Sequence, residues 1–249
     1  MDPWIVSAVG VGFTLGFRHA LDADHLAAVA AMVGDRRRTI AGCSHVGLIW
    51  GAGHASALLA VSLAVIGFGI RLPDRMAIWM EFAVGATLLF LGARVAWGYG
   101  RGAVLHAHPH AHGAREHFHP HVHPVSVEAA HASHHRLPAA TRRLMAAHGE
   151  NRRPFVVGAI HGMAGSAALM LLVMTAIPAT GARLLYTALF AAGSIGGMVI
   201  MSALVGLPFA LGGRLHGRSQ HGLRLAAGCL SAGFGLFMMW SLAPALGSQ

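Results

Sequence analysis

Long apolar stretches separated by short turns rich in arginine, glycine or proline set the pattern of this chain. A helix that crosses the hydrocarbon part of a bilayer takes about 20 residues, and each stretch reaches about that length. The pattern therefore predicts an all-α integral membrane protein with six transmembrane helices. We expect these helices at about residues 4–33, 42–70, 77–99, 155–178, 184–211 and 225–244.

The region between the third and fourth apolar stretches has a different composition. Residues 101–153 contain 12 of the 19 histidines, which alternate with other residues at 106–112 and 117–123. Low-complexity sequence of this kind is typical of a flexible metal-binding segment, with a linker that has no metal chemistry as the alternative. We expect a disordered, cytoplasmic His-rich loop at 101–153, between a first three-helix repeat (1–100) and a second one (154–249).

Three short patterns recur between the two halves of the chain. An odd number of helices in each repeat forces the second copy to be inverted in the membrane, an arrangement common in secondary transporters, whose binding site lies between the halves. The first half carries the charged residues, and the second has mostly small or apolar residues at the equivalent places. The matches are His19 with His161 (142 residues apart), Gly53-His54 with Gly193-Ser194 (140 apart), and 85–97 with 228–240 (143 apart).

Five ionisable residues fall within eight positions of the first apolar stretch, from Arg18 to His25. A charged group at such depth costs roughly 3 kcal/mol, so it needs a partner or a function. On a continuous helix with about 100° per residue, His19, Asp22 and His25 share one face, whereas Asp24 points elsewhere. Imidazole and carboxylate ligands suit Ni²⁺, Co²⁺ or Zn²⁺. A purely structural network of these charges is the alternative.

Two further histidines lie within apolar stretches. His54 follows Gly53 well inside the second stretch, and His161 lies near the start of the fourth. We predict that both complete the metal site, with a hydrogen-bonded structural histidine as the alternative for His54. His45 lies near the start of its stretch, which favours a position at the membrane interface.

The segment Arg18-His19-Ala20-Leu21-Asp22-Ala23-Asp24-His25 resembles the R-H-A-x-D-A-D-H motif of the nickel/cobalt transporter (NiCoT) family. This resemblance implies transport of a transition metal, with His19, Asp22, Asp24 and His25 as the metal-handling residues. The longer NiCoT proteins are described with eight spans and an acidic motif where this chain has Gly193-Ser194-Ile195-Gly196, which leaves the identity of the metal open. Residues 53–56 also resemble the family, and 161–166 and 193–198 resemble its shorter, urease-accessory, UreH-like branch.

Composition agrees with a membrane location. Hydrophobic residues make up 55% of the chain and charged residues 11%, so a soluble domain is excluded. The net charge of +9 comes from arginines that lie mainly in the loops, with six in the first and fifth loops against three in the second and fourth. The positive-inside rule then predicts both termini outside a bacterial inner membrane. The two cysteines form no CxxC pair, so a thiolate site is not indicated.

These observations predict a secondary transporter, not an enzyme, that moves Ni²⁺ or Co²⁺ by alternating access, with Zn²⁺ as a further candidate. We expect no prosthetic cofactor and no nucleic-acid partner; the expected partners are the metal ion, the bilayer and cytoplasmic metallochaperones. Alternatives are efflux of the same metals and a membrane-anchored metal buffer or chaperone that acts through the His-rich loop. Two weaker alternatives are a membrane metalloenzyme and an exporter of a small anion.

Overall fold

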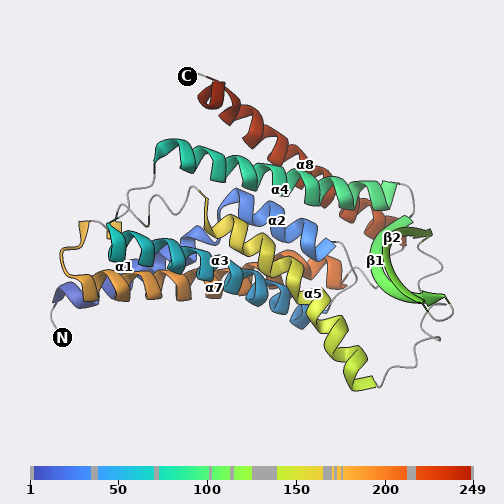
Figure 1. Ribbon diagram of the computed structural model, residues 1–249, viewed down its shortest axis with the longest axis horizontal. Coiled ribbons are helices and arrows are strands. Elements are labelled where there is room, and N and C mark those ends of the chain that lie inside the picture. The colour runs from blue at the N-terminus through green and yellow to red at the C-terminus, as the bar shows by residue number, and fades with distance from the viewer. Residues whose placement is uncertain are drawn as a thin grey trace.

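The computed structural model describes residues 3–34, 39–69, 73–100, 103–112, 115–124, 139–164, 170, 173–174, 176–211 and 217–247. Within these residues the fold consists of long helices and one hairpin (Figure 1). Four helical segments are long and apolar enough to cross a membrane: Ile40–Phe68, Arg75–Gly98, Thr180–Leu211 and Gln220–Leu246. The chain is therefore a helical membrane protein. The helices are α1 (Pro3–His19), α2 (Ala23–Gly34), α3 (Ile40–Phe68), α4 (Asp74–Gly100), α5 (Ala139–Gly162), α7 (Thr180–Leu211) and α8 (Gly217–Gly247).

The first apolar stretch is not one continuous helix. It is broken after His19, and α2 begins only at Ala23. Around the break, the amides of Leu21 and Asp22 donate to carbonyls three residues earlier, at 2.9 and 3.1 Å. Such bonds tighten and end an α-helix. The expectation of a single helix over 4–33 was therefore wrong, and the shared face argued from it does not apply across the break.

The fourth apolar stretch also differs from expectation. The helix α5 begins at Ala139, well inside the segment that the sequence assigns to the loop, and ends at Gly162 instead of continuing to about 178. Its first half is rich in polar residues and its second half is apolar. Of the stretch that follows, only 163–164, 170, 173–174 and 176–179 lie within the described residues.

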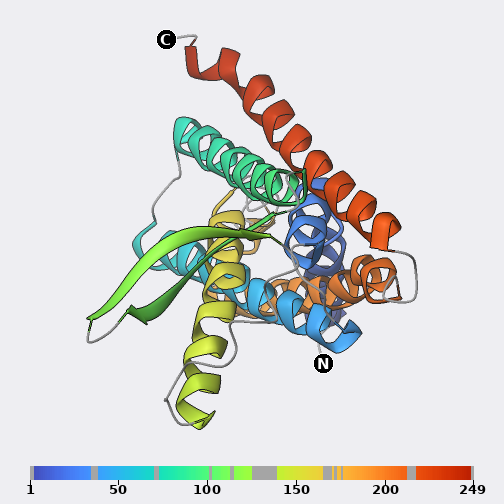
Figure 2. The same ribbon diagram turned by 90° about the vertical axis from the view of Figure 1, so that its right-hand side faces the viewer.

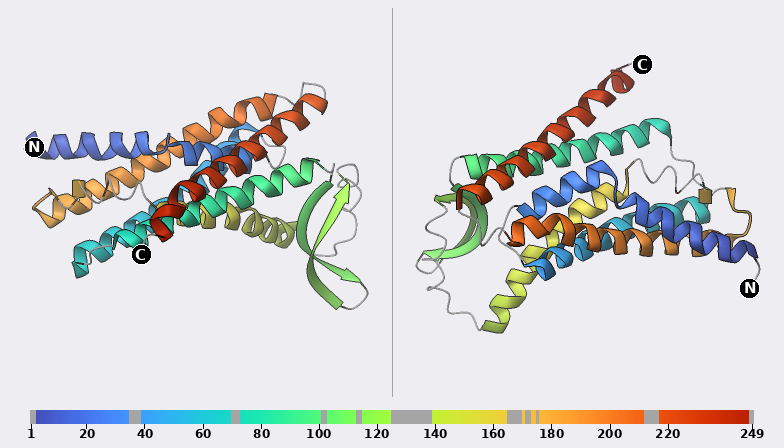
Figure 3. Two further views of the ribbon diagram at one scale, coloured as in Figure 1. Left: turned by 90° about the horizontal axis from the view of Figure 1, so that it is seen from above. Right: turned by 180° about the vertical axis from the view of Figure 1, so that it is seen from behind.

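The His-rich segment contains a two-stranded antiparallel hairpin. Its strands are β1 (Ala103–His112) and β2 (Arg115–Pro124). Histidine alternates there with apolar residues, and this period of two matches a strand, although the sequence predicts a flexible loop. The hairpin lies beyond one end of the helices (Figures 2 and 3), whereas both chain ends point toward the opposite end. Residues 125–138, also part of the expected disordered loop, lie outside the described residues.

Glycines set the closest helix contacts. A methyl group on Gly16 of α1 would collide with the carbonyl of Phe190 on α7, and one on Gly158 of α5 would collide with the carbonyl of Trp50 on α3. Without a side chain at these positions the backbones approach closely, as is common where helices associate in membranes. The helices pack in this way as α1 with α7, α3 with α5, and α4 with α8 (Figure 1).

The outer faces of the helices are apolar, as lipid contact requires. Phe68 is 82% exposed, Phe90 69% and Trp240 73%. In contrast, the interior where α2, α3 and α7 meet combines apolar residues such as Trp50 and Met198 with buried histidines. This polar interior inside an apolar bundle is the place where function is to be sought.

Candidate metal centre

Four buried histidines gather where the first helix is broken. His19 is the last residue of α1, His25 lies in the first turn of α2, His54 lies midway along α3, and His161 lies near the end of α5. None is more than 6% exposed. The break therefore has a consequence for the site, because it lets two short helices, which meet at an angle, direct two histidines toward a third on α3.

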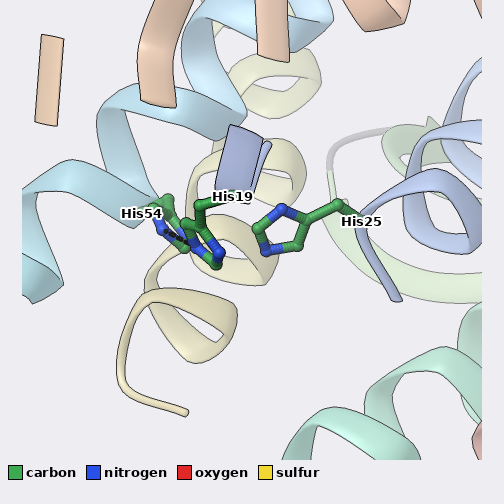
Figure 4. Close-up of side chains that lie close together, drawn as sticks. All are labelled: His19, His25 and His54. Atoms are coloured by element: carbon green, nitrogen blue, oxygen red, sulfur yellow. Dashed lines mark hydrogen bonds between the residues drawn. The ribbon is translucent and has the colours of Figure 1, made fainter. Parts of the chain in front are cut away.

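Three of these histidines approach closely enough to share one ion. The Nε2 atoms of His19 and His54 lie 3.0 Å apart. One ring nitrogen from each of His19, His25 and His54 lies within 4.8 Å of the others. Figure 4 shows the ring of His25 directed toward the adjacent rings of His19 and His54. Two imidazole nitrogens that each lie about 2 Å from one metal ion are roughly 3 Å apart, so the arrangement fits a metal with modest adjustment.

Asp22 contacts the site through His19. The Nδ1 atom of His19 donates to the carboxylate of Asp22 over 2.8 Å, and the Asp22 side chain is 47% exposed. A carboxylate that accepts from one ring nitrogen fixes the ring and leaves the other nitrogen as a lone-pair donor, as in many histidine ligands of metals. The geometry thus favours an orienting position for Asp22 over a ligand position.

His161 lies beside the three-histidine group. Its ring centre is 5.9 Å from that of His25. Its Nδ1 atom lies 2.9 Å from the carbonyl oxygen of Val157. A carbonyl can only accept, so Nδ1 carries the proton and Nε2 keeps its lone pair. This Nε2 atom has no hydrogen-bond partner among the described residues, and it is therefore prepared to act as a ligand.

Unpaired buried nitrogens mark the centre as a binding site. Within the part of the chain that the structure describes, both ring nitrogens of His25, Nδ1 of His54 and Nε2 of His161 lack a hydrogen-bond partner. Leaving one such atom unpaired typically costs about 1–3 kcal/mol. An ion that accepted these lone pairs would recover that cost, whereas a purely structural network would pair them internally.

The remaining residues of the motif lie at the edge of the centre. Asp24 approaches His25, with 3.8 Å between its Oδ2 atom and the Nε2 atom of His25, which is too long for a hydrogen bond. Arg18 is exposed on α1, and His45 is exposed in the first turns of α3. The structure therefore brings His19, His25 and His54 together, with His161, Asp22 and Asp24 around them.

Sequence reasoning missed two aromatic walls of the centre. Trp50 is fully buried and meets the rings of His25 and His161 edge-on, at centre distances of 5.1 and 6.0 Å. Phe190 stacks on His19 at 5.6 Å. Trp50 precedes His54 by one helical turn, which places both on one face of α3. That spacing was the available signal for Trp50; Phe190 comes from a distant helix.

Comparisons with known proteins give one full-length match. No family model matches the chain, and no solved structure matches it. The chain is 29% identical over 242 residues to the urease accessory protein UreH of Bacillus sp. (strain TB-90), covering 96% of this chain and 92% of that protein. A match that spans both chains agrees with the resemblance carried by Arg18–His25, 161–166 and 193–198. The chain belongs to the UreH-like branch of the nickel/cobalt transporter family.

Proposed function

We propose that this protein is a secondary transporter that carries a divalent transition metal, Ni²⁺ or Co²⁺, across the membrane by alternating access. The observation that carries the proposal is the convergence of His19, His25 and His54 within 4.8 Å in the buried interior of a membrane protein. Neutral imidazoles are suitable ligands for both metals.

The cargo ion exchanges part of its water shell for protein nitrogens. His19 offers Nε2, because Asp22 holds its Nδ1 atom, and His54 offers a nitrogen from α3. His25 completes the group, and His161 supplies a fourth nitrogen when the ion is present. Asp24 orients His25 or relays a proton. Protein groups thus replace water without a full negative cage, which lets the ion leave again.

Six spans in two inverted three-helix repeats provide the framework for alternating access. In this reading, α1 with α2 forms the first span, and the apolar half of α5 with the residues after it forms the fourth. Helix contacts support the repeat. The offsets that relate His19 to His161 and Gly53 to Gly193 carry the Gly16–Phe190 contact onto the Gly158–Trp50 contact.

Two other contacts repeat in the same way. The pair Gly193–Phe13 is carried onto Gly53–Phe155, and the offset of 143 residues carries Gly85–Gly235 onto Gly92–Gly228. A two-fold axis in the membrane plane would relate each pair. Three of the buried histidines then come from the first repeat and His161 from the second, so the ion lies between the two halves.

The arrangement of chain ends supports an orientation in the bacterial inner membrane. The His-rich hairpin and the two chain ends lie toward opposite ends of the helices (Figures 1 and 3). Combined with the arginine-rich first and fifth loops, this favours a cytoplasmic hairpin and external termini.

The relative's designation as a urease accessory protein favours Ni²⁺ over Co²⁺ and uptake over efflux, because urease is a nickel enzyme and a maturation role needs nickel in the cytoplasm. Cytoplasmic metallochaperones would receive the ion. The decisive experiment compares Ni²⁺, Co²⁺, Zn²⁺ and Mn²⁺ uptake into proteoliposomes under an imposed proton gradient. Saturable Ni²⁺ or Co²⁺ flux is expected, and equal leakage with and without the protein would end the proposal.

A membrane-anchored metal buffer is the second candidate, favoured by the 12 histidines of residues 101–153. Deletion of 104–136 separates the two functions. Flux through the helices persists in the deletion variant if the buried histidines carry the ion. Loss of every metal-related effect, with the helices still folded, would favour the buffer.

A further inference from the structure

The register of the hairpin pairs its histidines with one another. His106 lies opposite His121, His108 opposite His119, and His110 opposite His117. Three consecutive pairs of this kind do not follow from the sequence alone, because a shift of the register by one residue would set each of these histidines opposite a residue that is not histidine. The pairing is thus a property of the fold.

All histidines of the hairpin belong to one face. Alternate residues of a strand lie on the same face, and directly opposed residues share it. The even positions of β1 and the odd positions of β2 therefore form one face, which holds His112 and His123 besides the three pairs. The other face consists of alanine, leucine, valine, proline, phenylalanine and one glutamate, at 103–111 and 116–124.

The spacing of opposed positions suits metal binding. Residues directly opposite each other in an antiparallel pair have Cβ atoms about 4.5–5.5 Å apart. Two imidazoles starting from such positions can bring one nitrogen each to a single ion at about 2 Å. Water completes the coordination, so borderline divalent cations such as Ni²⁺, Zn²⁺ and Cu²⁺ are the suitable class of ligand.

We propose that β1 and β2 form a ladder of metal sites outside the bundle, in which each opposed histidine pair (His106/His121, His108/His119, His110/His117) is one binding unit for a divalent cation. This site is separate from the buried centre and does not rest on the transport proposal. It also differs from a flexible scavenging tract, because binding depends on which histidines face each other.

Metal binding and hairpin formation support each other in this arrangement. An isolated two-stranded hairpin is only marginally stable in water. An ion that binds the paired strands and not the open chain stabilises the hairpin by its own binding free energy. Because β1 begins three residues after α4 ends at Gly100, ions collect next to the end of a membrane helix.

The test compares double variants of the full-length protein in detergent, each lacking two histidines. His106→Gln with His121→Gln removes one opposed pair. His106→Gln with His117→Gln removes one member from each of two pairs. Equilibrium dialysis at fixed free Ni²⁺ gives the ions bound per chain, and the buried centre contributes equally to every variant.

The paired double variant should lose no more Ni²⁺ than either of its single variants, whereas the unpaired double variant should lose about twice as much. Ala107→Gln with Ala111→Gln, on the opposite face of β1, is the control and should bind the wild-type amount. Equal losses in the paired and unpaired variants, no loss in either, or loss in the control would each overturn the ladder. None of these outcomes bears on flux through the buried histidines.

Discussion

The Nε2 atoms of His19 and His54 lie 3.0 Å apart, although 35 residues separate them in the chain. One residue ends a helix and the other lies in the middle of the next long helix. Two neutral imidazoles at this distance share a single proton or a single ion. Since Asp22 accepts the proton from Nδ1 of His19, the Nε2 atom of His19 offers its lone pair to the same point as His54.

Replacement of His54 by alanine should abolish most metal transport. The variant removes one of three converging nitrogens, and we expect flux at low metal concentration to fall about tenfold or more, since even residues that only support a ligand contribute that much. Uptake of radioactive Ni²⁺ into proteoliposomes measures the effect. His45→Ala is the matched control on the same helix, because His45 is exposed. Equal flux in both variants would contradict the assigned site.

Asp22→Asn tests the orienting contact with His19. Asparagine keeps the size of the side chain but removes the charge that holds the Nδ1 proton, so we expect an apparent metal affinity about 10–100-fold lower. The concentration dependence of uptake gives this value. Glu81→Gln on α4, which changes a carboxylate away from the histidine-bearing helices, should leave it unchanged. A normal affinity for Asp22→Asn would show that His19 needs no such support.

Gly193→Ala should destabilise the protein, whereas Gly196→Ala should not. A methyl group at Gly193 meets the carbonyl of Phe13 on α1, but nothing lies within 4 Å of the same position on Gly196. Overpacking of this kind costs about 1–3 kcal/mol, while alanine in an open helical position is favourable. Thermal unfolding in detergent compares the two variants. Similar melting temperatures would argue against the close contact of α1 and α7.

Fusions at the C-terminus test the proposed orientation. Alkaline phosphatase fused after Gly247 should be active, and green fluorescent protein fused there should be dark, because both require this end to be outside. The same reporters inserted into 125–138 should show the reverse pattern. Activity and fluorescence are measured in whole cells, with expression checked by immunoblot. A fluorescent C-terminal fusion would invert the assigned orientation and the direction in which the His-rich segment faces.

The sequence by itself determined the class of the protein and the residues of its centre. Hydrophobicity is a local sum over about 20 residues, so membrane helices were predictable from it. Charged groups at such depth carry a high cost, and this cost pointed to His19, His25 and His54 without any knowledge of their positions in space. The spacings shared by the two halves were also readable, and the contacts of Gly16 and Gly158 agree with them.

Only the tertiary structure decided how these residues are used. Propensity did not reveal the break after His19, because it depends on backbone bonds and on the contact with Asp22. The roles of Trp50 and Phe190 depend on where α3 and α7 cross the broken helix. The opposed histidines of the hairpin follow from its register. Each of these relationships joins residues across helices or strands, and periodicity within one segment carries no information about such distances.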